Sequence, residues 1–278
     1  MTKKIRVLHY SNQLSLGGTE RTMESFCRHL DRDKFDVYAA SIVHKTAPST
    51  KTRLWLGNLV GHSKSQAKLK SLRQMNARIP NFKDLLDDHL FILNSTDELA
   101  TILKKYKIDI LHVHTSGRAE FPTDNTDVLT SVKAVVTTNQ FELQNKSEAQ
   151  KYIKKMLFVS KWLLENKATW AKNDPRADVV YNPIEEPLSN EHLREALGID
   201  EAHFVIGRVG RADPGIHDNI SLLAYQKIQN PNTWFLALSA PQNMIDEAKK
   251  MNLINFISIP ATTDPSYLSK FYNPIDVL

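Results

Sequence analysis

Short apolar runs alternate with longer amphipathic stretches along this chain. Up to residue 181, the runs that predict β-strands are 5–10, 35–42, 89–93, 108–114, 134–138, 156–159 and 178–181. The intervening stretches that predict helices are 19–31, 63–75, 96–106 and 161–171. Strands separated by crossovers of helix length indicate an α/β fold, in which helices cover both faces of a parallel sheet.

A second alternation begins after a segment with two prolines and two acidic residues, 182–187, which is typical of a linker. Strands are predicted at 203–209, 233–238 and 254–259, and helices at 190–197, 219–229, 242–251 and 265–271. We therefore expect an N-terminal domain over 1–182, a linker over 183–190 and a second domain over 191–278. Residues 276–278 have the pattern of a further strand, so we expect the second domain to be incomplete as presented.

The composition is that of a soluble globular protein, with 41% hydrophobic and 24% charged residues among 278. No apolar run is long enough to span a bilayer, and the first residues lack the core of a signal peptide. The single cysteine, Cys27, excludes an intrachain disulfide and shares an apolar helical stripe with Met23, Phe26 and Leu30. We expect a buried thiol and a cytoplasmic protein.

Positive charge is concentrated in one stretch. Residues 37–83 carry nine of the 36 Lys and Arg residues and none of the 31 Asp and Glu residues. Such a patch, Lys45–Lys83, attracts an anionic membrane surface or an anionic acceptor, although a solvated helix face explains it equally well. Nucleic acid is not expected as a partner, because only Trp55 and Phe82 interrupt the patch as stacking aromatics.

Ligands of parallel α/β sheets bind at the carboxyl ends of the strands, which selects four places in this sequence. The first is Gly17-Gly18, between a predicted strand and a predicted helix. Free backbone N–H groups at a helix start suit a phosphate or a sugar hydroxyl. An ordinary strand-to-helix turn is the alternative explanation of the two glycines.

The second place is the strand that contains His112 and His114, whose spacing puts both imidazoles on one face. We expect His112 to be structural and His114, at the strand end, to be near a substrate. Zinc is not expected, because no third ligand follows at a suitable spacing. Ser116 follows this strand, and Asn139 and Glu142 form the third place after the next one; they are candidates to bind hydroxyls, with turn formation by Asn139 as the alternative.

The fourth place is Gly207–Arg211, where a predicted strand ends in a glycine and an arginine. A guanidinium in this position suits a diphosphate, because it offers fork-shaped donors and a permanent charge. A surface loop arginine is the alternative.

Six segments, in order, resemble the retaining GT-B glycosyltransferases of family four (group 1 type). They are the opening strand with its Gly-Gly-x-Glu-Arg, Asp109–His114, Phe158–Trp162, Val179–Ile184, Ile206–Arg211 and Tyr267–Val277. The resemblance implies two Rossmann-like domains, a nucleotide-sugar donor, and transfer of a hexose to a glycan or lipid-linked acceptor with retention of configuration. It implies no metal and no other cofactor.

The resemblance also implies residue roles. Arg211 would contact the diphosphate and His114 the sugar near the reaction centre, which makes these two the predicted catalytic residues. Gly17, Gly18 and His217 would complete the donor and phosphate site. Ser116, Asn139 and Glu142 would bind the acceptor or the sugar.

The sequence departs from the family pattern at three points. Ile216, beside His217, stands where the family has a lysine, Pro183 stands where it has a linker glycine, and its donor-binding glutamates would follow Leu278. The missing lysine and the missing glutamates favour two alternatives to an active enzyme, a non-catalytic GT-B-like binding module or a subunit completed by another chain. A nucleotide-sugar 2-epimerase that uses Glu142 and His114 is a third alternative.

Overall fold

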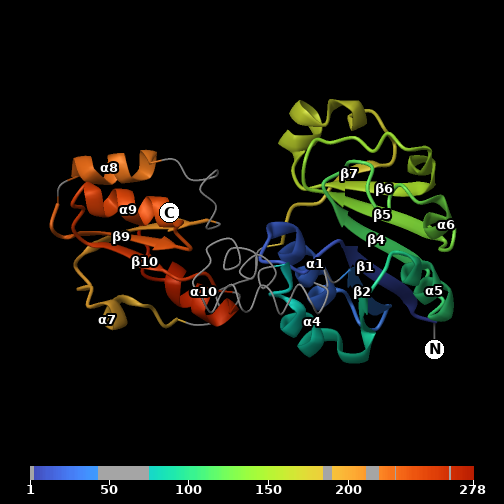
Figure 1. The fold of residues 1–278 in the computed structure, drawn as a ribbon, viewed down its shortest axis with the longest axis horizontal. Helices are drawn as coiled ribbons and strands as arrows, with labels where there is room; N and C mark the ends of the chain where they lie inside the picture. The colour runs from blue at the N-terminus through green and yellow to red at the C-terminus, as the bar shows by residue number, and fades with distance from the viewer. Residues whose placement is uncertain (1–2, 43–74, 184–189, 211–218, 229, 263) are drawn as a thin grey trace, which may run out of the picture. The chain divides into compact units, whose positions relative to one another are not determined.

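The computed structural model describes residues 3–42, 75–183, 190–210, 219–228, 230–262 and 264–278 (Figure 1). The chain divides into two compact units, Met1–Ile184 and Glu185–Leu278. This division falls inside the predicted linker 183–190. Each unit is built around its own parallel sheet.

The first unit contains a seven-stranded parallel sheet in the order β3-β2-β1-β4-β5-β6-β7. Its strands are β1 (Ile5–Ser11), β2 (Phe35–Ile42), β3 (Leu90–Leu93), β4 (Ile110–Thr115), β5 (Ala134–Asn139), β6 (Ile153–Phe158) and β7 (Ala177–Val179). The order changes direction at β1, since β2 and β3 lie to one side of it and β4 to β7 to the other. The carboxyl ends of β1 and β4, adjacent in space but far apart in sequence, therefore form the switch point at which such sheets bind ligands.

Helices cover both faces of this sheet (Figure 1). The α-helices of the unit are α1 (Gly18–His29), α4 (Ile79–Leu86), α5 (Asp97–Lys105) and α6 (Thr126–Leu129). Alternation along β2 shows the two faces: Val37 and Ala39 pack with α1 and α4, whereas Tyr38 and Ala40 pack with α5 and α6. Cys27 is fully buried in the α1 layer, as predicted.

Most predicted elements of this unit are present within two or three residues of their expected ends, and four helical regions differ, among them the short helix α6, which was not predicted. Helix α4 was not predicted, and the predicted helix 63–75 lies, apart from Met75, outside the described residues. The predicted helix 161–171 is instead a π-type turn at Leu163–Lys167 followed by a 3-10 turn at Thr169–Ala171. Trp170 explains the break, because its indole packs edge-on against Phe158 and donates a hydrogen bond to the backbone oxygen of Glu142. Two further 3-10 turns lie at Asp87–His89 and Glu148–Tyr152.

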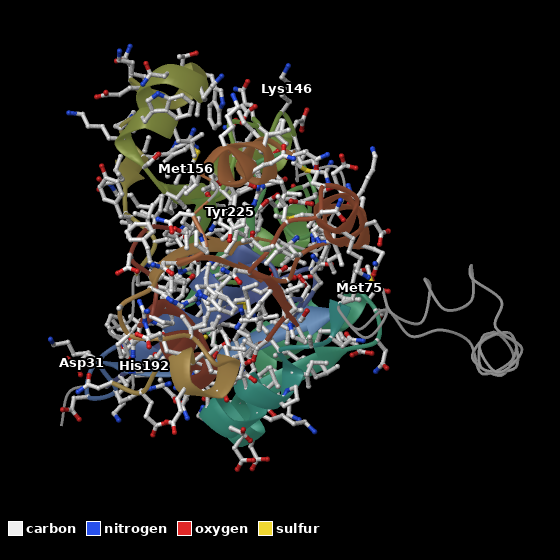
Figure 2. All side chains as sticks on the ribbon, turned by 90° about the vertical axis from the view of Figure 1, so that its left-hand side faces the viewer. Asp31, Met75, Lys146, Met156, His192 and Tyr225 are labelled. Carbon is white, nitrogen blue, oxygen red and sulfur yellow. The ribbon has the colours of Figure 1, made fainter. Side chains whose placement is uncertain are left out.

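The second unit contains a three-stranded parallel sheet in the order β10-β9-β8. Its elements are α7 (Arg194–Leu197), β8 (Phe204–Val209), α8 (Ile220–Ile228), β9 (Thr233–Leu238), α9 (Gln242–Lys250), β10 (Phe256–Ile259) and α10 (Pro265–Tyr272). Helices α8 and α9 pack on one face, and α7 and α10 pack on the other. Tyr225 (Figure 2) ties α8 to the sheet, because its hydroxyl donates to the backbone oxygens of Thr233 and Ile254. At the predicted strand 276–278 the structure has no strand but a single parallel bridge between Val277 and Ile206.

The predicted α/β fold with two parallel sheets is thus confirmed. Among the residues described, no helix combines the length and the apolar character needed to cross a membrane.

Candidate functional site

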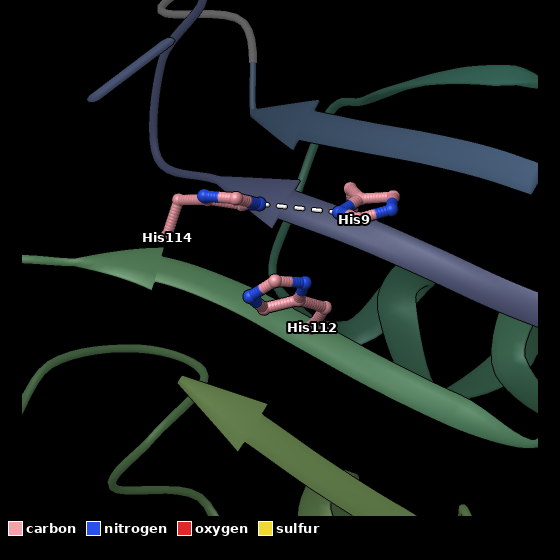
Figure 3. A group of neighbouring side chains, drawn as sticks. All are labelled: His9, His112 and His114. Atoms are coloured by element: carbon pink, nitrogen blue, oxygen red, sulfur yellow. Dashed lines mark hydrogen bonds between the residues drawn. The ribbon is translucent and has the colours of Figure 1, made fainter. Parts of the chain in front are cut away.

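Three histidines meet at the switch point of the first sheet (Figure 3). His9 lies on β1 and is in register with His112 on β4, and His114 lies one pleat further toward the end of β4. All three rings lie under Phe26 of α1, with centroids 5.1–6.0 Å from its ring. The strand period that puts His112 and His114 on one face therefore also selects His9 from the neighbouring strand.

The imidazoles are joined by specific hydrogen bonds. His9 Nδ1 and His114 Nε2 lie 3.1 Å apart and share one hydrogen. His112 Nε2 lies 2.8 Å from the Thr138 hydroxyl on β5, which gives His112 the structural partner expected for it. In the part of the chain that the structure describes, His9 Nε2 and His114 Nδ1 are buried without any hydrogen-bond partner.

The cluster is electrically neutral at physiological pH. Burial lowers the pKa of His112 to about 4. Burial also holds the pKa values of His9 and His114 well below 6.5, with a smaller contribution from their histidine neighbours. The histidines therefore act through hydrogen bonds rather than through charge.

The same three side chains offer ligand atoms that all lie within 4.8 Å of one another, so a third potential metal ligand exists that the sequence spacing did not reveal. A divalent metal ion is nevertheless poorly suited to the three histidines. No described carboxylate joins the three imidazoles, and the nearby Arg32 guanidinium further lowers the pKa of His9. Metal-bound histidines usually donate their second N–H to an acceptor, and the outer nitrogens of His9 and His114 have none. The residues fit a neutral, hydrogen-bonding ligand better, and the absence of a metal cofactor stays a prediction.

A carboxylate that the sequence reasoning missed, Glu120, lies just beyond the end of β4. Its Oε1 accepts hydrogen bonds from the hydroxyls of Thr115 at 2.7 Å and Ser116 at 3.0 Å. Its Oε2 accepts a longer one, 3.4 Å, from the amide of Asn12 at the end of β1. Glu120 thus joins the ends of β1 and β4 in a half-buried polar cluster, which retains acceptor capacity for hydroxyl groups.

The predicted hydroxyl-binding residues differ in their placement. Ser116 is half-buried and belongs to the Glu120 cluster, and Asn139 is buried at the end of β5. Glu142 is exposed, and its backbone oxygen accepts the hydrogen bond from Trp170. Gly117, at φ +101°, brings the segments after β4 and β5 together, since an added Cβ would overlap the Leu143 carbonyl oxygen. The ends of β4 and β5 are therefore one packed edge.

The two glycines before α1 are not equivalent. Gly17 has extended backbone, at φ −68° and ψ 164°, and its N–H donates to the Ser15 hydroxyl at 3.2 Å. The Glu20 side chain, which is buried, folds over Gly17 and occupies the space that a Cβ would take. Gly18 is exposed and has open space around it. An anion at this helix start would therefore meet the Glu20 carboxylate, so only Gly18 keeps the geometry expected of a phosphate contact.

Two of the predicted donor-site residues, Arg211 and His217, lie outside the described residues. So does the basic stretch Lys45–Lys83 up to residue 74. The end of that stretch corrects the expectation of a continuous surface patch. Arg78 is buried, and its guanidinium lies 2.7 Å from the carboxylate of the buried Glu24. This ion pair joins the start of α4 to α1, so Arg78 is not part of a surface patch. Phe82 is fully buried against α1 and is not available to stack on a base.

Two residues of this site, His9 and Glu120, escaped the sequence reasoning, and the contact of a third, Glu20, with Gly17 was not expected. His9 gives a signal only when the register of β1 and β4 is known, because 103 residues separate it from His112 in the chain. Glu120 follows a strand end by five residues and has no motif of its own. Glu20 was visible, three residues after Gly17, and its position in the first helical turn is a known place for an acidic residue.

Comparison with known proteins gives fold matches alone. No protein-family model matches the chain, and no curated protein matches its sequence. Among solved structures, a glycosyltransferase from Rickettsia africae is 18% identical, with 99% of this chain and 72% of that chain covered and a TM-score of 0.62. HepE from Anabaena, solved with UDP and glucose, is 12% identical, with 96% and 72% covered and a TM-score of 0.56.

A further match is a putative UDP-N-acetylglucosamine 2-epimerase from Listeria monocytogenes, 10% identical, with 97% and 73% covered and a TM-score of 0.53. These similarities extend over both units of the chain. The fold is therefore that of the GT-B glycosyltransferases and of their structural relatives.

Proposed function

We propose that this chain is a glycosyltransferase that uses a nucleotide-sugar donor. One observation carries the proposal: the histidine cluster and the Glu120 cluster lie together at the carboxyl edge of a sheet whose fold matches that of glycosyltransferases. This edge offers hydrogen-bond donors and acceptors without a net cationic charge, which suits the hydroxyls of a sugar. The sequence resemblance supports the finer proposal, transfer of a hexose to a glycan or lipid-linked acceptor with retention of configuration.

The roles within this proposal follow position. His114 contacts the transferred sugar, and Gly18 approaches the donor at the start of α1. Ser116 and Asn139 bind hydroxyls of the sugar or acceptor, with Glu120 orienting Ser116. Glu142 is exposed, so we assign it to contacts with a large acceptor.

The diphosphate is assigned to Arg211 and His217 on the resemblance alone. Stabilising the leaving diphosphate electrostatically is the main chemical requirement of such a transfer, and a guanidinium meets it. Neither a metal nor another cofactor is proposed.

The first test is a thermal-shift screen against UDP, GDP, ADP and CDP, followed by assays for nucleotide release from the matching nucleotide sugars. A donor site raises the melting temperature for one base, because a ligand that binds only the folded state stabilises it. Arg211→Ala should abolish turnover and weaken nucleoside diphosphate binding, whereas Lys104→Ala, on the exposed side of α5, should change neither. Unchanged kinetics in Arg211→Ala would remove Arg211 from the site. The anomeric configuration of the product, determined by NMR, tests whether the transfer retains configuration.

Two alternatives make different predictions in the same assays. A binding module, which the isoleucine at position 216 favours, gives a thermal shift but no nucleotide release with any acceptor. An epimerase, which the Listeria neighbour favours, converts the nucleotide sugar to its 2-epimer without an acceptor. Sedimentation with anionic and neutral vesicles tests whether Lys45–Lys83 holds the protein at a membrane surface.

A further inference from the structure

The shared hydrogen between His9 and His114 determines what the pair can offer to a ligand. Two neutral imidazoles carry two N–H groups and four nitrogens in total. One N–H is used in the 3.1 Å contact between His9 Nδ1 and His114 Nε2. The other must sit on one of the two outer nitrogens, His9 Nε2 or His114 Nδ1, and neither has a partner among the described residues. The pair therefore has one donor end and one acceptor end.

The two ends lie in different surroundings. His9 is fully buried, and its ring stacks on Phe26 with a centroid separation of 6.0 Å and an interplanar angle of 26°. His114 lies at the end of β4, and Figure 3 shows its outer nitrogen pointing away from His9, in the direction of the carboxyl ends of the strands. The loop that follows β1 passes on this side, and its residues 12, 13, 15 and 16 are only half-buried. His114 is itself buried, but its outer nitrogen faces the strand ends, where ligands of parallel sheets bind, whereas the His9 ring lies deeper in the sheet against Phe26.

A buried N–H without a partner is rarer in proteins than a buried acceptor without one, because leaving it unpaired is the costlier of the two. Only the end that faces the strand ends can gain a partner from a ligand, so the bare nitrogen belongs on His9 Nε2 and the N–H belongs on His114 Nδ1. In this arrangement His9 Nδ1–H donates to His114 Nε2.

We propose that His9 is a positioning residue that fixes His114 in the Nδ1–H form, so that His114 presents a hydrogen-bond donor to an oxygen of the ligand. An oxygen of the ligand accepts this hydrogen bond, which removes the unpaired N–H. The accepting oxygen belongs either to a sugar hydroxyl or to a diphosphate, and both can accept a hydrogen bond. The assignment to a nucleotide sugar rests on the proposed function, but the form of the imidazole does not.

The test is ¹⁵N NMR of the full chain with labelled histidine, because long-range ¹H–¹⁵N correlations distinguish the Nδ1–H from the Nε2–H form of each ring. His114 is expected as Nδ1–H in the ligand-free protein. In His9→Asn, the side-chain amide nitrogen stands close to the place of Nδ1 and still donates, so His114 should keep this form. In His9→Phe, which removes the donor but keeps a ring, His114 should change to Nε2–H. His112→Asn is the matched control, since His112 bonds to Thr138 rather than to His114, and it should leave His114 unchanged.

Two results would overturn the proposal: an Nε2–H form of His114 in the wild-type chain, or an Nδ1–H form that persists in a folded His9→Phe variant. Far-UV circular dichroism establishes that the variants are folded. Because no turnover is needed, an inactive chain with the expected imidazole form would refute the proposed function and leave this inference standing.

Titration with named probes then identifies the source of the oxygen. A shift of the His114 Nδ1 resonance with UDP alone assigns it to the diphosphate, and a shift with UDP-glucose but not with UDP assigns it to the sugar. Where turnover is found, His9→Phe should lower kcat/KM about tenfold and His9→Asn should restore most of it, since one hydrogen bond of about 1.4 kcal/mol corresponds to this factor. Equal kcat/KM in His9→Phe and the wild type would contradict a positioning role.

Discussion

A substitution at Gly117 tests whether the close packing of the ends of β4 and β5 depends on the backbone conformation of this glycine. Gly117→Ala puts a Cβ onto a residue with φ +101° and into the Leu143 carbonyl oxygen, a backbone atom that cannot move alone. The conformation costs about 1–2 kcal/mol for an L-residue, and overpacking adds about 1–3 kcal/mol. We expect the first unit to lose about 3 kcal/mol of unfolding free energy.

Two other glycines of this chain serve as matched controls. Gly198 has φ +68° but open space around it, so Gly198→Ala should cost only the conformational part, about 1 kcal/mol, and only in the second unit. Gly18→Ala, in open space at the start of α1, should be neutral or slightly stabilising. Equilibrium urea unfolding, with peptide-resolved hydrogen exchange to assign each transition to a unit, measures all three. Equal losses in Gly117→Ala and Gly198→Ala would refute the overlap with Leu143.

Three further outcomes follow from the buried polar groups. Glu24→Gln should destabilise the first unit by about 3 kcal/mol in urea unfolding, because Arg78 is left buried without its counter-charge, and Glu24→Leu combined with Arg78→Met should recover most of this. The lowered pKa of His112, about 4, makes folding oppose its protonation: the contribution of His112 to stability is complete above pH 6.5 and falls by up to about 3 kcal/mol toward pH 4. His112→Asn should make the acid loss smaller by about this amount, while the lowered pKa values of His9 and His114 keep the rest of the slope. The Cys27 thiol, fully buried and with a raised pKa, should react with a thiol reagent only after unfolding; labelling of the native protein within minutes would contradict its placement.

The sequence pattern was sufficient for the strands and insufficient for some of the helices. Strands of a doubly covered sheet are continuous apolar runs, so β2 and β9 match their predicted ranges at both ends. Helix α4 begins with Ile79-Pro80 and presents only two buried residues, Phe82 and Leu86, too few to give a helical period. The predicted helix 161–171 has the right composition, but the contacts of Trp170 with β6 and with the segment after β5 override local propensity.

The candidate site was predictable where it depended on one strand and not where it depended on two. His114, Ser116 and Asn139 were selected because each lies at or just past the end of an apolar run. His9 enters through the parallel register of β1 with β4, which no local pattern encodes. Glu120 enters through a turn after β4 that returns its carboxylate to Thr115 and Ser116. Long-range register and turn geometry are tertiary properties, so sequence reasoning names the strand ends but not their partners.

The position of Glu20 changes the interpretation of the glycine pair before α1. A helix start with free N–H groups attracts an anion, but here a buried carboxylate already lies over Gly17 and takes the favourable end of the helix dipole. A diphosphate at the same place would bring like charges together in a poorly hydrated site, whereas a neutral sugar would not. The neutral histidines and the Glu120 cluster extend this preference across the edge of the sheet. The described residues at this edge of the first unit therefore suit hydroxyl groups better than they suit a diphosphate at the start of α1.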